Sequence, residues 1–204
     1  MTTTDTPPAV TTTPAGGGTI PGPRVVGVDI SLTATGLASS AGWCHSLGVD
    51  KLTTLPLPQR QAALRDLGVD ILTSIGHPDL VVIEAPAYSR SGGGNSERAG
   101  LWWHIVHALA GREIPVVEVM SSTRIRYATG KGVGSKGAVI DAVARRFPDY
   151  QTGGDDNCAD AVVLMAMGRD HLGLPLAAMP QAHRAALAAV RWPEMPALDP
   201  AGVA

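Results

Sequence analysis

The sequence predicts an α/β domain built on a mixed five-stranded β-sheet with helices on both faces. Three short strand-like runs come first along the chain, and two further apolar runs then alternate with segments of helical periodicity. This order indicates an antiparallel meander followed by parallel strands. The predicted strands are 24–30, 36–40, 43–49, 80–86 and 114–119, and the predicted helices are 58–76, 96–111, 136–146 and 156–171.

The first half of the sheet follows from local patterns. The segment 24–30 is a β-branched apolar run, which is typical of a buried strand, and the pair 41–42 forms the turn between the next two strands. The helix 58–76 has apolar residues at helical spacing and ends in a Gly-His-Pro stop signal at 76–78.

The second half alternates between strands and helices. The strand 80–86 is closed by Pro86, and a glycine-rich loop leads into the helix 96–111, on which one of the neighbouring tryptophans Trp102 and Trp103 is expected to face the core. The run 114–119 is the last buried strand, and two more helices follow it.

The two ends of the chain differ in composition from its centre. Residues 1–23 are Thr, Pro, Gly and Ala with almost no large apolar side chain, so a disordered tail is expected there. Residues 174–204 are rich in Ala and Pro and are expected to form a second tail with one short helix around 181–190. The working domain is therefore predicted to span 24–173.

Composition excludes several classes of protein. The sequence has no apolar run of about 18 residues, so no transmembrane helix is expected. Its N-terminus lacks the basic and apolar regions of a secretory signal, and two cysteines cannot make a disulfide framework. We expect a cytoplasmic protein without a membrane partner.

Two acidic residues stand on otherwise apolar strands. Asp29 is the only charged residue between Arg24 and Asp50, and Glu84 ends an apolar run in the same way. A buried carboxylate is costly unless it is paired or metal-bound. One such residue could simply accept backbone hydrogen bonds at a strand end, but two on strands that can be neighbours favour a site.

A third group of acids lies at the start of the helix 156–171. Asp156 and Asp160 are four residues apart on one helical face, with Asn157 nearby, whereas Asp155 has the position of an N-cap. Several carboxylates without a set of Cys or His ligands favour Mg²⁺ or Mn²⁺ over zinc. Two such ions per site could activate water against a phosphodiester.

Positive charge is concentrated in the segment 90–146. It contains nine Lys and Arg against four Asp and Glu, a net +5 in a chain whose formal charge is −2. The densest part, 124–139, combines glycines with Lys131 and Lys136. Its spacing is not that of a Walker A loop, so no nucleotide cofactor is expected, and a positive surface beside an acidic pocket favours a polyanion.

Four sequence blocks resemble, in order, those of RuvC-type Holliday-junction resolvases, with the short bacteriophage and actinobacterial versions most similar. The blocks are GVDISLTATGLA (27–38), VVIEAPAYSR (81–90), ATGKGVGSKGAV (128–139) and DDNCADAV (155–162). The resemblance implies a ribonuclease H-like fold and a homodimer on a four-way DNA junction. It also implies Mg²⁺-dependent symmetric nicking that leaves 5′-phosphate and 3′-hydroxyl ends.

The resemblance also implies roles for individual residues. Asp29, Glu84 and Asp160 match the acids of the family site, and Lys136 matches the lysine near the scissile phosphate. The loop 88–95 matches the segment that enters the junction, where Tyr88 could stack on a base. The expected DNA-contacting residues are Tyr88, Arg90, Arg124, Arg126, Lys131 and Lys136.

The chain departs from the family pattern at two positions. Asn157 stands where the family has Asp or His, so the fourth ligand is either Asp156 or Asn157. Ile125 stands where the family has a lysine, so either Arg124 or Arg126 is expected to replace that lysine.

Three other functions stay open on the sequence alone. The segment 27–36 also resembles the first phosphate loop of the sugar-kinase and heat-shock ATPase superfamily, although those proteins need two such domains. A different ribonuclease H-like nuclease, acting on flaps, branched DNA or RNA–DNA hybrids, is a second alternative. A non-catalytic junction-binding protein with a decayed site is a third.

Overall fold

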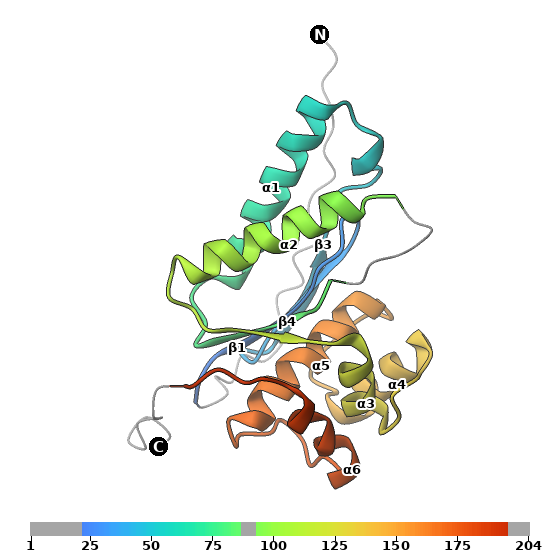
Figure 1. Ribbon diagram of the computed structural model, residues 1–204. Helices are drawn as coiled ribbons and strands as arrows, with labels where there is room; N and C mark the ends of the chain where they lie inside the picture. Colours follow the sequence, from blue (N-terminus) through green and yellow to red (C-terminus); the bar gives the residue numbers. More distant parts are fainter. Residues whose placement is uncertain (1–21, 87–92, 196–204) are drawn as a thin grey trace.

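The computed structural model describes residues 22–86 and 93–195, and its core is a five-stranded sheet with helices on both faces (Figure 1). The strands are β1 (Val25–Asp29), β2 (Thr35–Ser39), β3 (Trp43–Leu47), β4 (Leu80–Glu84) and β5 (Val116–Val119). The helices are α1 (Leu57–Ile75), α2 (Asn95–Ala110), α3 (Ser121–Thr129), α4 (Lys136–Arg146), α5 (Asp156–His171) and α6 (Gln181–Arg184), with 3₁₀ turns at Leu52–Thr54 and Ala185–Ala189.

The sheet is mixed, as predicted. Its strand order is β3-β2-β1-β4-β5, in which β1, β2 and β3 pair antiparallel while β4 pairs parallel with both β1 and β5. The two parallel pairs follow helical crossovers, which is the connection that parallel strands require. The carboxyl ends of β1, β4 and β5 therefore lie at one edge of the sheet.

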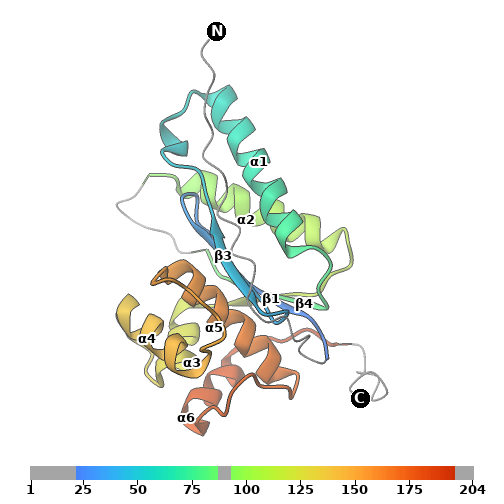
Figure 2. The same cartoon turned by 180° about the vertical axis from the view of Figure 1, so that it is seen from behind.

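Two hydrophobic cores lie on opposite faces of this sheet. Helices α1 and α2 cover one face, and α5 with α3 and α4 covers the other (Figures 1 and 2). Strand β1 contributes to both cores by alternation, because Val26 and Val28 pack toward α1 and α2 whereas Val25 packs toward α5.

Two glycines let α5 lie unusually close to the sheet. A Cβ atom added at Gly27 would lie 2.1 Å from the carbonyl oxygen of Ala161, and one added at Gly36 would lie 2.0 Å from that of Asn157. Any side chain at either position would therefore displace the helix backbone. The N-terminal half of α5 is held against the ends of β1 and β2 by main-chain contact.

The structure contains one helix that the sequence pattern did not predict, and it adds residues to the domain. Helix α3 lies directly after β5 and packs against α4, α5 and the C-terminal segment. Residues beyond the predicted boundary at 173 also pack against the core, including Leu176, Met179 and Leu187. The described part of this unit reaches residue 195, and residues 1–21 and 196–204 of the predicted tails lie outside the described residues.

No helix in the described parts of the chain is both long and apolar enough to cross a membrane.

Candidate active site

The strand ends bring two of the predicted acids together. In the parallel β1–β4 pair Val28 is opposite Ile83, so the next residues, Asp29 and Glu84, occupy the adjacent carboxyl ends of the two strands. Both acids are partly buried. The indole Nε1 of Trp102, which the structure buries, donates a hydrogen bond of 2.9 Å to the backbone carbonyl of Glu84 and fixes the end of β4.

Helix α5 supplies the third acid. Asp29 is two residues after Gly27 on β1 and therefore shares the face on which α5 packs. Asp160 lies on the first part of α5, one residue before the carbonyl that touches Gly27. The close contact between helix and sheet thus brings Asp160 beside the acids of β1 and β4.

Arg124 of α3 joins two of these acids. Its Nε donates to Oε2 of Glu84, and its Nη1 donates to Oδ1 of Asp160. The arginine is 5% exposed, although the sequence predicted it at a DNA-facing surface. Its pKa is raised above the ordinary value because the attraction of Glu84 and Asp160 outweighs the effect of burial.

The acids strongly influence one another's protonation. Burial, followed by repulsion from Glu84 and Asp160, raises the pKa of Asp29 to about 7. Burial also raises the pKa of Asp160 to about 6, although Arg124 opposes that change. Perturbed carboxyl groups gathered in this way are typical of functional sites.

At the start of α5, Asp155 has a structural role that differs from the role of the acids in the site. The Asp155 carboxylate caps the helix by accepting hydrogen bonds from the backbone amides of Asn157 and Cys158, at 2.8 and 3.4 Å, and it also accepts one from the hydroxyl of Ser46 at 2.7 Å. These contacts confirm its predicted role as an N-cap. The side-chain amide of Asn157 also donates to Asp155, at 3.1 Å.

Asp156 and Lys136 form an ion pair next to this cluster. The carboxylate of Asp156 is close enough to raise the pKa of both Asp29 and Asp160. Lys136 begins α4, its side chain is 81% exposed, and its pKa is raised by the hydrogen bond to Asp156. Its ammonium group is thus open to an incoming anion.

The remaining predicted DNA contacts divide into two groups. Arg126 and Lys131 are exposed, on α3 and in the loop after it. Tyr88 and Arg90 lie outside the described residues.

The chemistry of the side chains in the site can be compared with the ligands that the implied metal ion prefers. Asp29, Glu84 and Asp160 offer only carboxylate oxygens, which are the hard ligands that Mg²⁺ and Mn²⁺ prefer, and their mutual repulsion favours a bound cation. Within 22–86 and 93–195, however, no three acidic, His or Cys side chains form a ready set of metal ligands. The donor chemistry fits, while the guanidinium of Arg124 takes the position between two of the donors.

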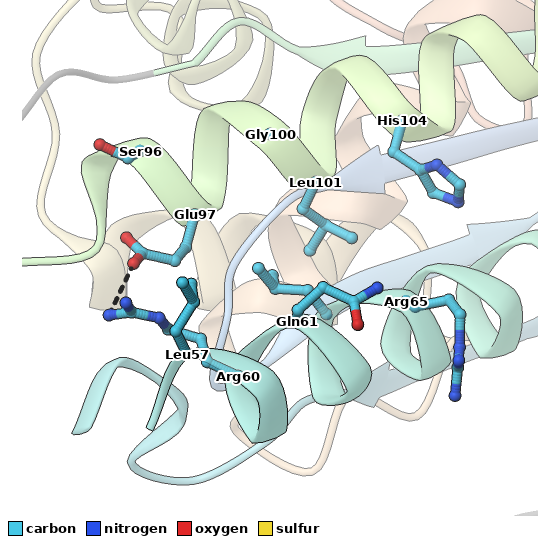
Figure 3. A pocket seen from close by; sticks show the side chains of 10 residues that line it. Leu57, Arg60, Gln61, Arg65, Ser96, Glu97, Gly100, Leu101 and His104 are labelled. Atoms are coloured by element: carbon cyan, nitrogen blue, oxygen red, sulfur yellow. Dashed lines mark ion pairs between the residues drawn. The ribbon is translucent and has the colours of Figure 1, made fainter. Parts of the chain in front are cut away.

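A pocket of about 530 Å³ lies elsewhere, between α1 and α2 (Figure 3). An ion pair of 3.1 Å between Arg60 and Glu97 closes one end of it, and Leu101 and His104 line its wall. None of the predicted site residues that the structure describes lines this pocket, so it is separate from the acid cluster.

Comparison with solved structures identifies the fold. The complex described as T. thermophilus RuvC with Holliday junction substrate matches with a TM-score of 0.50 and 17% identity, over 75% of this chain and 98% of that chain. The chain has a RuvC-type fold. A second Thermus thermophilus RuvC structure matches with a TM-score of 0.49 and 16% identity, over 74% of this chain and 97% of that chain. No protein-family model and no curated protein matches the chain.

The RuvC-type fold confirms the ribonuclease H-like architecture expected from the four sequence blocks. Within this fold the structure brings together Asp29, Glu84 and Asp160, with Asp156 and Lys136 beside them. Sequence reasoning missed the role of Arg124. One sequence feature could have indicated it. Arg124 follows closely after β5, and the carboxyl end of β5 lies beside that of β4, where Glu84 stands.

Proposed function

We propose that this chain is a metal-dependent, structure-selective endonuclease that resolves four-way DNA junctions by paired symmetric nicks. The observation that carries the proposal is the convergence of Asp29, Glu84 and Asp160 at one edge of a RuvC-type sheet. A solved protein with this fold is described in complex with a Holliday junction substrate. Two nicks at a symmetric junction need two sites, so the proposal includes a homodimer.

Asp29, Glu84 and Asp160 would hold the metal, with Asp156 as the fourth acid. Asp156 is favoured over Asn157 because it repels the other carboxylates electrostatically, whereas the Asn157 amide donates to the Asp155 cap. Bound Mg²⁺ supplies Lewis acidity and lowers the pKa of a water ligand. We propose two ions per site, with Mn²⁺ able to replace Mg²⁺.

The chain's own residues would orient and neutralise the substrate. Lys136 places an exposed ammonium group beside Asp156, where it can bind a phosphate oxygen and stabilise developing negative charge. Arg126 and Lys131 extend this positive surface along α3 and the following loop. The Asp155 cap holds the first turn of α5 in place and with it Asp156 and Asp160.

Cleavage of a synthetic four-way junction tests the proposal. The wild-type protein should nick it symmetrically with Mg²⁺, whereas Asp29→Asn and Glu84→Gln should lose about 1,000-fold or more of the rate. Both variants should still bind the junction, because phosphate contacts provide most of the affinity. Faster cleavage of flaps or RNA–DNA hybrids would reassign the substrate, and full activity in either variant would overturn the site.

A further inference from the structure

Arg124 is the cation that the acid cluster holds in this structure. Its planar fork reaches carboxylates on two different elements, Glu84 at the end of β4 and Asp160 on α5. The side chains of all three are nearly buried, with exposed fractions of 6% for Arg124, 11% for Glu84 and 15% for Asp160. The three side chains therefore form a nearly buried ion-pair network at the centre of the site.

The charges in this network favour further neutralisation. A guanidinium group keeps its single positive charge throughout the pH range of protein function. It neutralises one of the two acids that it bridges, and Asp29, at the end of the strand adjacent to that of Glu84, adds a third carboxyl group. A divalent cation would supply twice the charge to the same oxygens.

A metal ion and Arg124 cannot bind these oxygens independently. Oε2 of Glu84 and Oδ1 of Asp160 already accept hydrogen bonds from the guanidinium. An ion coordinated by the same two carboxylates would also repel a positive charge held between them. An ion that uses these two oxygens therefore displaces Arg124 from at least one acid.

We propose that Arg124 is an internal competitor of the divalent cation and thereby sets the metal affinity of the site. This inference rests on the metal site of the proposed function. It makes Arg124 a positioning residue that holds Glu84 and Asp160 in place and must be displaced when metal binds.

Calorimetric titration with MnCl₂, without DNA, provides the first test. Arg124→Gln should bind Mn²⁺ about tenfold more tightly than the wild-type protein. Arg145→Gln is the matched control, because Arg145 is an exposed arginine paired with Asp141 and should leave the affinity unchanged. An unchanged or weaker affinity in Arg124→Gln would overturn the proposal.

A measurement on the unmodified protein avoids dependence on how Arg124→Gln folds. The ¹⁵N NMR signal of the Arg124 side-chain Nε–H should shift on titration with diamagnetic Mg²⁺, while that of Arg145 stays in place. A fixed Arg124 signal at saturating Mg²⁺ would contradict displacement. Arg124→Lys, whose ammonium group cannot bridge two acids in the same fork geometry, provides a second variant and should also bind Mn²⁺ more tightly.

Glu84→Gln separates this proposal from the proposed function. Loss of Mn²⁺ binding in Glu84→Gln without tightening in Arg124→Gln would overturn the Arg124 proposal and leave the metal site standing. Unchanged Mn²⁺ binding in Glu84→Gln would overturn the metal site and the Arg124 proposal together.

Discussion

Asp29 on β1 is paired directly with Gly36 on β2 across the antiparallel ladder. The missing side chain at Gly36 is what allows the backbone of Asn157 to approach the sheet, since an added Cβ would lie 2.0 Å from its carbonyl oxygen. The residue opposite the first acid of the site thus determines how closely α5, which carries Asp160, can approach Asp29.

Gly36→Ala should therefore destabilise the protein strongly. The added methyl group forces the backbone of α5 away from the sheet, and we expect a loss of about 3 kcal/mol in the free energy of unfolding. Urea denaturation measures this loss. Gly100→Ala is the matched control, because Gly100 lies in α2 and the added Cβ would have no atom within 4 Å beyond the nearby backbone of its own helix, so this variant should be neutral or stabilising. Equal stabilities of the two variants would contradict the close-contact argument.

The pKa of Asp29 predicts how stability depends on pH. Its folded-state value of about 7 is above the ordinary 3.8, so the folded protein binds the proton more tightly than the unfolded chain. The stabilisation from this group is complete below about pH 4 and is lost as the pH rises through 7. Asp29→Asn should remove this dependence and be more stable than the wild-type protein by about 4 kcal/mol at pH 8.

Urea denaturation in EDTA between pH 4 and 8 provides the comparison for Asp29→Asn. Asp160, whose pKa is raised to about 6, contributes a smaller total change in stability, of the same sign, in both proteins. Parallel pH profiles for the two proteins would show that Asp29 ionises normally in the folded state.

The N-cap of α5 offers a third prediction. Asp155→Ala removes the acceptor for two backbone amides and for the Ser46 hydroxyl, and should cost about 1–2 kcal/mol. Asp155→Ser should recover part of this loss, because serine also caps helices well. Equal stability of the alanine and serine variants in thermal denaturation would show that the capping contacts do not stabilise the protein.

Asp170 connects the C-terminal segment to the helix that carries Arg124. It is 2% exposed, accepts a hydrogen bond of 3.0 Å from the Tyr127 hydroxyl of α3, and forms an ion pair of 2.8 Å with Arg184 of α6. Asp170→Ala should cost about 3 kcal/mol, because it leaves both partners without their acceptor. Tyr127→Phe removes one of these contacts and should cost about 1 kcal/mol. A larger loss in Tyr127→Phe than in Asp170→Ala would contradict the central role of the carboxylate.

Most of the fold could be predicted from the sequence because its strands are short apolar runs and most of its helices have clear periodicity. Asp29 and Glu84 could be identified because each is a charge on an apolar strand, and Asp160 because it directly precedes the apolar run 161–167 of its helix. Helix α3 could not be predicted in the same way. It has no side-chain N-cap, and Tyr127 and Ala128 are buried through contacts with segments distant in sequence.

The sequence also could not show that the Arg124 side chain points toward the acids. Arg124 and Arg126 are two residues apart, so they point to nearly opposite sides of a helix, and only the docking of α3 decides which side faces the acids. The structure buries Arg124 and exposes Arg126. The segment after 173 was also hard to interpret, because its composition is rich in Ala and Pro, yet the Trp192 ring stacks on the His171 ring with 4.2 Å between their centroids.

The contacts between α3 and the C-terminal segment impose an order on biosynthesis. The ring nitrogen Nδ1 of His183 hydrogen-bonds with the carbonyl of Tyr127 at 2.8 Å, across 56 residues of sequence. A ribosome completes β1, β4 and α3 well before it adds this histidine, so the nascent chain holds α3 before its contact with His183 can form. A nascent chain shorter than 183 residues therefore lacks this contact between α3 and α6.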